Sequence, residues 1–225
     1  PIFGLQNAIF GFANLFIQIG VNSFDASMVV ANSAASNSDP LVYNIMSAFY
    51  VACSTFIGQN YGAEKKSRVL KSYFISLACS FCFALFLGIL LFIFGRNFIS
   101  IFISDSAIIE LGMRRLSIMA FSYCISAFMD CTIAASRGLG QTSVPTVIVI
   151  LGSCVFRIAW IFSVFAYFKT IESLYLLFAF SWTITAVAEI FYFARLYKQK
   201  FSVSALIILG IRSEERRVGK ECPRC

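Results

Sequence analysis

Six long apolar stretches divide the chain, and each is long enough to cross a bilayer as an α-helix. They cover about residues 1–24, 40–57, 72–95, 116–136, 144–168 and 173–194. A transmembrane helix needs roughly 20 mainly apolar residues, and within lipid only helices or closed barrels satisfy every backbone hydrogen bond. None of the stretches alternates polar and apolar residues as barrel strands do. The pattern predicts an all-α, polytopic membrane protein with six transmembrane helices in one bundle.

The domain boundaries follow from the same pattern. The predicted six-span bundle covers residues 1–198, and residues 199–211 are apolar but too short to span, so we expect them at the membrane interface. Residues 212–225 are highly charged and unlike the rest, which favours a non-native or disordered tail, with a solvated cytoplasmic tail as the alternative. The sequence starts with Pro1 inside an apolar stretch, so we expect it to be one part of a longer protein.

Composition narrows the function. With 59% hydrophobic and only 13% charged residues, a water-soluble globule is excluded. The chain has no His, which excludes Ser-His and Cys-His dyads and His-ligated zinc, and we predict neither enzymatic activity nor a bound cofactor or metal. Six of the 8 Cys lie in apolar stretches, where reduced Cys behaves as a small hydrophobe.

The net charge of +7 is explained by membrane orientation and not by a nucleic-acid partner, because most basic residues flank the apolar stretches. Alternate loops sort them into two groups. One side has eight, namely Lys65, Lys66, Arg68, Lys71, Arg137, Arg195, Lys198 and Lys200. The other has four, namely Arg96, Arg114, Arg115 and Lys169. The side with eight should be cytoplasmic, which predicts a multi-pass plasma-membrane protein with both ends of the six-span unit inside the cell.

Polar residues share one face of the first stretch. At 100° per residue a sector of about 80° contains Asn7, Gly11, Asn14, Gln18, Asn22 and Asp25. Such a face either makes hydrogen bonds between helices or lines a water-filled cavity. The second stretch shows a weaker face of the same kind, with Asn44, Ser47, Thr55 and Gly58. The two faces could line one cavity.

Three ionisable residues lie within the stretches. Asp130 and Glu189 are at similar depth, roughly 8 to 10 Å inside the predicted cytoplasmic edge at 1.5 Å per residue. A carboxylate in a low-dielectric site can exchange protons or bind sodium, so both are candidates for ion coupling. Glu189 is also close enough to the edge to reach toward Arg195. Arg157, near the middle of its stretch, needs an acidic or carbonyl partner, and we expect it to tie helices together.

Several short segments, taken in order, resemble the multidrug and toxic compound extrusion (MATE) transporters. They read GLQNAIFGFANLFIQIGVNSF from residue 4, ANSAASN from 31, TFIGQNYGA from 55, SRGLGQTSVP from 136 and LGSCVFRIAW from 151. Their order and spacing are similar to the second half of that family, over about residues 1–198. The resemblance implies a twelve-helix antiporter, made of two six-helix bundles, that exports small, often aromatic, organic cations in exchange for H⁺ or Na⁺.

The resemblance also implies partners and site residues. This chain would be the C-terminal bundle, surrounded by membrane lipid and paired with an N-terminal six-helix half. Many members have a functional acid one turn before Asp130, where this chain has Ser126. Cation–π contacts would come from residues such as Tyr43, Phe49 or Tyr50. The cavity-lining candidates are Asn7, Asn14, Gln18, Asn22, Asn44, Ser47 and Ser126.

Two other functions stay open. A lipid-linked oligosaccharide flippase of the same superfamily would want several cationic residues in its cavity, whereas Arg157 alone is deep in a stretch. A six-span structural or channel subunit would carry a regular Arg series or a pore loop, and neither is present in the sequence. An intramembrane protease is disfavoured further, because it needs a Ser-His pair or two facing Asp residues.

Overall fold

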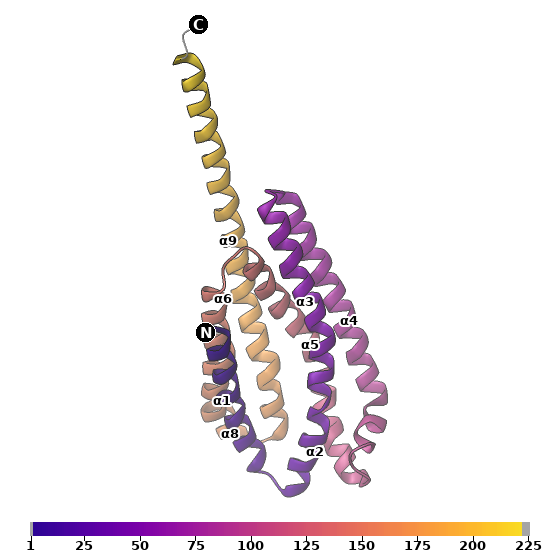
Figure 1. The fold of residues 1–225 in the computed structure, drawn as a ribbon. Coiled ribbons are helices and arrows are strands. Elements are labelled where there is room, and N and C mark those ends of the chain that lie inside the picture. Colours follow the sequence, from indigo (N-terminus) through magenta and orange to yellow (C-terminus); the bar gives the residue numbers. More distant parts are fainter. Residues whose placement is uncertain (1, 222–225) are drawn as a thin grey trace.

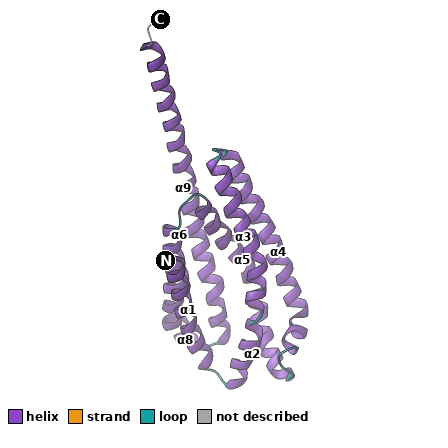
Figure 2. Ribbon diagram, viewed as in Figure 1, coloured by secondary structure: helices purple, strands orange, loops and turns teal. Residues whose placement is uncertain are grey.

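The computed structural model describes the backbone of residues 2–221 and the side chains of Ile9 and residues 11–201. Over this part the chain is helical with short connections and no strand (Figure 2), which confirms the predicted all-α class. The principal helices are α1 (Ile2–Asn22), α2 (Ala26–Ser36), α3 (Ser38–Gly62), α4 (Lys66–Ser100), α5 (Ser106–Gly138) and α9 (Ile171–Glu221).

Between α5 and α9 lies one irregular helical rod. It consists of α6 (Ser143–Val149), α7 (Phe156–Trp160) and α8 (Ala166–Phe168), joined by π-helical segments over Ile150–Val155 and Ile161–Phe165. Such wide turns inside an α-helix are uncommon and accommodate one extra residue. The rod therefore keeps its direction while the rotational register of its side chains changes.

Helix α5 is the centre of the bundle. It packs against α2, α3, α4 and α9, and it has the longest series of buried residues. In Figure 1 the pair α3 and α4 stands on one side, while α1 and the α6–α8 rod stand on the other, packed on each other and on α9. Two groups of helices thus face each other across a central space.

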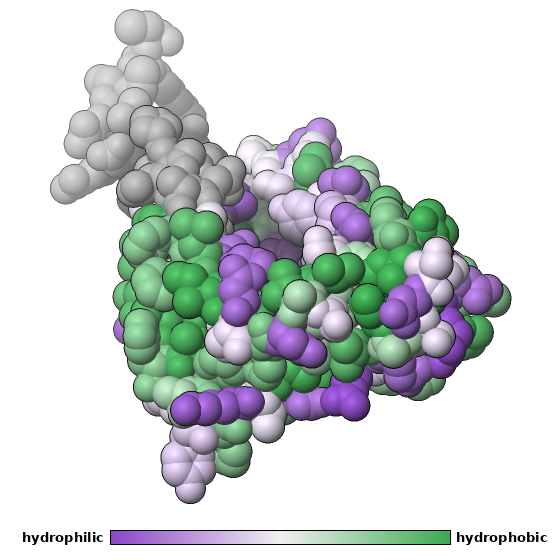
Figure 3. Space-filling model, turned by 90° about the horizontal axis from the view of Figure 1, so that it is seen from below, coloured by the Kyte–Doolittle hydropathy of each residue, from purple (hydrophilic) through white to green (hydrophobic). Residues whose placement is uncertain are grey.

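Five helical stretches of the described residues are long and apolar enough to cross a membrane. They are Ala26–Gly62, Lys66–Ser100, Ser106–Gly138, Ser143–Phe168 and Ile171–Phe201. Large apolar side chains point outward along them, as at Phe74, which is 60% exposed, and Phe191, which is 74% exposed. Figure 3 shows such apolar residues over much of the surface and a hollow near its centre. This surface suits lipid as the surrounding solvent.

The helices extend past the apolar stretches that predicted them. Gly58 and Gly95, which stand where the second and third apolar stretches end in the sequence, are internal positions of α3 and α4. The small size of Gly95 serves packing, because a Cβ there would lie 2.9 Å from Leu116 Cδ1. Helix α9 continues through residues 199–211 and ends at Glu221, and residues 222–225 of the predicted tail lie outside the described residues.

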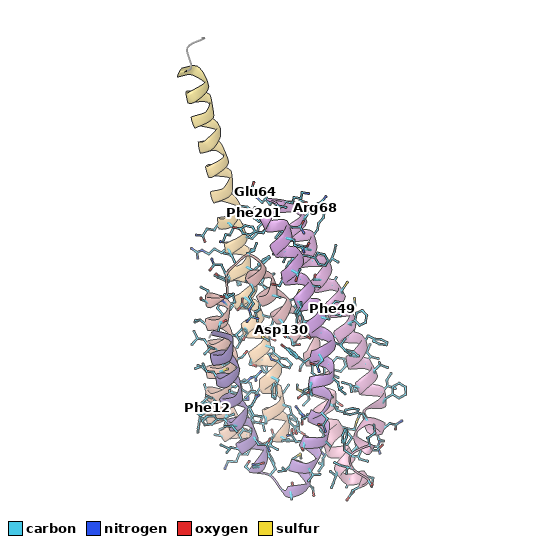
Figure 4. The ribbon with its side chains drawn as sticks, viewed as in Figure 1. Phe12, Phe49, Glu64, Arg68, Asp130 and Phe201 are labelled. Atoms are coloured by element: carbon cyan, nitrogen blue, oxygen red, sulfur yellow. The ribbon has the colours of Figure 1, made fainter. Side chains whose placement is uncertain are left out.

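Several of the eight basic residues that the sequence groups on one side lie at one end of the bundle, among them Lys66 and Arg68 on α4 and Lys200 on α9. Lys66 Nζ lies 5.7 Å from the centre of the Tyr197 ring, and Lys200 Nζ lies 5.6 Å from that of Tyr61. Figure 4 shows Glu64, Arg68 and Phe201 together at this end. The position of these residues at one end agrees with the group of basic residues that the sequence assigns to one side of the membrane.

Candidate functional site

A cavity of about 500 Å³ lies between the two groups of helices. Residues of α3 and α5 form most of its wall, and α1, the α6–α8 rod and α9 complete it. Its polar and aromatic lining residues include Asn14, Asp39, Tyr43, Tyr50, Tyr123, Ser126, Asp130, Arg137, Arg157, Phe178 and Trp182. A space of this size, with aromatic walls and a few charged groups, is typical of a small-molecule site.

Asp130, the ion-coupling candidate of the sequence, lies on the cavity wall near the middle of the bundle (Figure 4). Ser126, one turn earlier on α5, lines the same cavity and donates its hydroxyl to the Tyr123 carbonyl at 2.9 Å. The two residues share a face because i and i+4 positions stack on a helix. Asp130 therefore presents a carboxyl group on the same side of α5 as the Ser126 hydroxyl.

Glu189 is on α9, fully buried, and is absent from the cavity wall. It does not reach toward Arg195 as the edge position suggested, and Arg195 is exposed. Arg137 lies instead within Coulomb range of both Glu189 and Asp130. Neither carboxylate oxygen of Glu189 has a hydrogen-bond partner among the described residues. Burial of a carboxylate is costly without a counter-charge. Arg137 is a positive charge that acts on both acids and offsets part of this cost.

Arg137 belongs to the last turn of α5 and lines the cavity. The sequence assigned it to a cytoplasmic loop, because the apolar stretch ends at residue 136. The helix continues for two further residues, which carries the side chain onto the cavity face. Arg137 therefore adds a second guanidinium group, besides that of Arg157, to the wall of this space, which the sequence did not predict.

Arg157 ties two helical segments together, as expected. Its Nε donates to Ser181 Oγ on α9 at 3.2 Å, and its guanidinium lies 4.7 Å from the centre of the Phe178 ring. The side chain is 3% exposed and borders the cavity. A hydroxyl and an aromatic face thus contribute to its environment.

The sequence did not reveal an ion pair at the opposite end of the cavity. Arg115 Nη2 lies 2.5 Å from Asp39 Oδ2, and Tyr123 Oη donates to Asp39 Oδ1 at 2.6 Å. Arg115 also donates to the Asn32 carbonyl at 3.2 Å, and Tyr175 Oη donates to Asn32 Oδ1 at 3.2 Å. These bonds join α2, α3, α5 and α9. Arg115 had been counted as an outer loop charge, whereas its side chain is buried.

The polar face of α1 divides in two. Asn14 lines the cavity. Gln18 and Asn22 are exposed, and Gln18 Nε2 donates to Asn22 Oδ1 at 2.8 Å, so they satisfy each other along the helix. The side chain of Asn7 lies outside the described residues.

On α3 the cavity face is not the predicted one. Asn44 is exposed and Ser47 donates to its carbonyl at 2.8 Å, and neither residue lines the cavity. Tyr43 and Tyr50 do line it, whereas Phe49 contacts Phe83 of α4 with tilted rings whose centres lie 5.0 Å apart. The helix turns its apolar and aromatic side toward the cavity, because that side also packs on α5.

Comparisons with known proteins agree with this architecture. The MatE family model matches residues 2–162. A protein of Thermotoga maritima described as "Probable multidrug resistance protein NorM" is 26% identical over 163 residues, which cover 69% of this chain and 35% of that protein. A protein of Photorhabdus laumondii with the same description is 24% identical over 55% of this chain and 26% of its own length.

Two solved structures have the same fold. The Vibrio cholerae MATE transporter VcmN in the bent form superimposes with a TM-score of 0.77 at 16% identity, over 87% of this chain and 44% of that one. A further MATE structure in the bent conformation gives a TM-score of 0.69 at 14% identity, over 81% and 41%. The chain spans less than half the length of these proteins.

An all-α membrane bundle with a charged central cavity is the architecture of a transporter half. The chain belongs to the MatE family, whose members are membrane transporters and not enzymes.

Proposed function

We propose that this chain forms one six-helix half of a secondary antiporter that exports cationic, aromatic organic compounds in exchange for H⁺ or Na⁺. The observation that carries the proposal is the position of Asp130, a carboxylate on the wall of a cavity with aromatic sides. The family membership and the descriptions of the two relatives as multidrug resistance proteins support it. The other half of the transporter would be an N-terminal six-helix bundle.

Asp130 and Glu189 are the proposed coupling residues. Both are within Coulomb range of Arg137, so a proton or sodium ion that neutralises one acid changes the charge balance of the whole group. A change in that balance alters which helices attract each other, because Asp130 and Arg137 are on α5 while Glu189 is on α9. Rocking of the two halves around the cavity would then alternate its access.

Aromatic side chains supply the proposed substrate contacts. Tyr43 and Tyr50 face the cavity from α3, and Phe178 and Trp182 face it from α9. Ring faces attract organic cations, with about 0.5 to 2 kcal/mol per contact. Release of such a cation would follow when Asp130 takes up the coupling ion.

The proposed location is the plasma membrane, with both ends of the bundle in the cytoplasm and lipid around its apolar surface. The excess of Lys and Arg in the loops near Lys66 and Lys200 supports this orientation. Transport would need no cofactor besides the coupling ion.

The decisive experiment uses the full-length protein in a strain that lacks other efflux pumps. Asp130→Asn should lower the initial rate of ethidium efflux by about tenfold or more, because the amide cannot exchange a proton or attract a cation. Asp25→Asn is the matched control, since Asp25 is exposed, lies off the cavity wall and makes no side-chain cap bond. Unchanged efflux in Asp130→Asn at equal expression would refute this role for Asp130.

A lipid-linked oligosaccharide flippase is the second candidate, favoured by one observation. Arg137 and Arg157 both border the cavity, and guanidinium groups bind phosphate oxygens. Reconstituted vesicles distinguish the two functions. Translocation of a pyrophosphate-linked lipid without any transport of organic cations would support the flippase, and the reverse result would support the antiporter.

A further inference from the structure

Two buried thiols meet between α3 and α5. Cys53 and Cys131 are 78 residues apart in the sequence, and their Sγ atoms lie 3.7 Å apart. Both side chains are fully buried, and both cysteines are free thiols. Cys53 Sγ also lies 3.8 Å from the Cys131 carbonyl, so this thiol points directly at the neighbouring helix.

The sulfur separation suits a bridge of one atom better than a direct bond. A disulfide requires about 2.05 Å between sulfurs, so its formation would draw the two helices' side chains together by roughly 1.6 Å. A single metal ion with metal–sulfur bonds of about 2.3 Å accepts any separation up to about 4.6 Å. The thiols are already within the range that one bridging ion spans.

Ligand number and charge narrow the class of ion. Among the described residues no group of three or more His, Cys, Asp or Glu could hold a metal, so the pair supplies two ligands and does not build a four-ligand zinc site. Soft ions prefer thiolates and accept low coordination numbers. Two thiolates and one divalent ion form a neutral complex, whereas a monovalent ion would leave a net negative charge within the bundle, where charge is costly.

We propose that Cys53 and Cys131 form a dithiol site for a soft, thiophilic divalent cation such as Hg²⁺. The ion displaces both thiol protons to water and forms two metal–sulfur bonds, with no change of oxidation state. Mercuric chloride, a neutral species that enters apolar phases, would react with two thiols to form the bis-thiolate and two molecules of hydrogen chloride. This site does not depend on the proposed transport function.

A bound ion would fasten α3 to α5 at the wall of the cavity. Tyr50 precedes Cys53 by one turn of α3, and Asp130 is the residue before Cys131 on α5. Any rearrangement that slides one helix along the other would have to break a metal–sulfur bond. The site would therefore make the protein sensitive to thiophilic metals.

The test uses the whole chain purified in detergent, with all other cysteines replaced by Ser so that Cys53 and Cys131 remain. The matched control keeps Cys53 and Cys154, two buried cysteines in different parts of the bundle. Each protein is loaded with mercuric chloride and washed with excess monothiol. Because two tethered thiolates bind one ion together, the Cys53/Cys131 protein should retain about tenfold more mercury than the control, close to one ion per chain.

A second measurement keeps the test sound if these variants fold poorly. The unaltered chain is treated with mercuric chloride, denatured and alkylated with a maleimide, and its peptides are analysed by mass spectrometry. Joint protection of the Cys53 and Cys131 peptides supports the site. Equal mercury retention in both variants, or alkylation of either cysteine, overturns it. Loss of two hydrogens from the untreated pair also overturns it, because it would show a disulfide.

Discussion

Arg115 and Asp39 form an ion pair between the first part of α5 and the first turn of α3, with Nη2 and Oδ2 2.5 Å apart. The arginine side chain is 6% exposed and the aspartate 35%. Asp39 also borders the cavity, at the end opposite Arg137. Charged residues of α3 and α5 therefore border the cavity at both of its ends.

Removing one partner of the Arg115–Asp39 pair should be more harmful than removing both. Arg115→Met leaves Asp39 without its guanidinium, which we expect to destabilise the protein by about 3 kcal/mol. The double variant Arg115→Met/Asp39→Asn should regain more than half of this loss, since no charge is left unpaired. Thermal unfolding in detergent measures both. An Arg115→Met protein as stable as the parent would contradict the pairing.

Two buried tyrosines provide a matched comparison of hydrogen bonds. Tyr123 donates to the Asp39 carboxylate at 2.6 Å, whereas the hydroxyls of Tyr73 and Thr132 are hydrogen-bonded to each other at 2.9 Å. Bonds to a charged group contribute about 1.5 to 3 kcal/mol, and bonds between neutral groups inside membrane bundles average about 0.6 kcal/mol. Tyr123→Phe should therefore lower the free energy of unfolding more than Tyr73→Phe does. The opposite order would contradict the larger contribution expected of the bond between Tyr123 and Asp39.

Replacement by alanine should destabilise the protein at one glycine and not at another. A Cβ at Gly88 of α4 would collide with the Ala120 carbonyl of α5, while a Cβ at Gly62 meets nothing within 4 Å. Gly88→Ala should cost about 2 kcal/mol by overpacking. Gly62→Ala should be neutral or stabilise by up to about 0.8 kcal/mol through helix propensity. Unfolding curves for both variants, compared with the parent, test the contact between α4 and α5.

Arg157 should not tolerate replacement by lysine. Its planar guanidinium donates to Ser181 and covers the Phe178 ring, a geometry that an ammonium group does not reproduce. We expect Arg157→Lys to destabilise by about 1 to 2 kcal/mol. Arg114→Lys is the control, because its ion pair with Glu172 is largely exposed and should change stability by less than about 0.5 kcal/mol. If Arg157→Lys were as stable as the parent protein, the positive charge alone, and not the guanidinium geometry, would account for the role of Arg157 in stability.

The helices could be predicted from the sequence because burial in lipid imposes long apolar runs. Their ends could not, since α4 and α5 continue for several polar residues beyond those runs. Arg115 and Arg137 were consequently interpreted as loop charges. In the structure Arg115 lies well inside α5 and Arg137 in its last turn, and both take part in charged groups at the cavity.

Asp130 and Asn14 could be named as candidates because isolated polar groups within an apolar run have few other positions available, and Ser126 could be named from the family resemblance. The side of α3 that lines the cavity was predicted wrongly, because the prediction looked for polar residues. Asn44 and Ser47 are the polar residues of that stretch, but the cavity is lined by Tyr43 and Tyr50, which the sequence offered only as aromatic contacts for a cation. The pairing of Cys53 with Cys131, 78 residues apart in the sequence, has no local signal at all.

The two π-helical segments in the α6–α8 rod also bear on how this protein can change in evolution. Each wide turn contains one residue more than a regular α-turn needs. Leu151, which is exposed, lies in the first of these turns. Its deletion would convert the wide turn to a regular α-turn, and Val149 and Arg157 would still face the same sides of the rod as they do now. Most single deletions in a membrane helix rotate everything beyond them by about 100°. The rod is thus the one part of the described bundle where span length can vary without exchanging lipid-facing and cavity-facing residues.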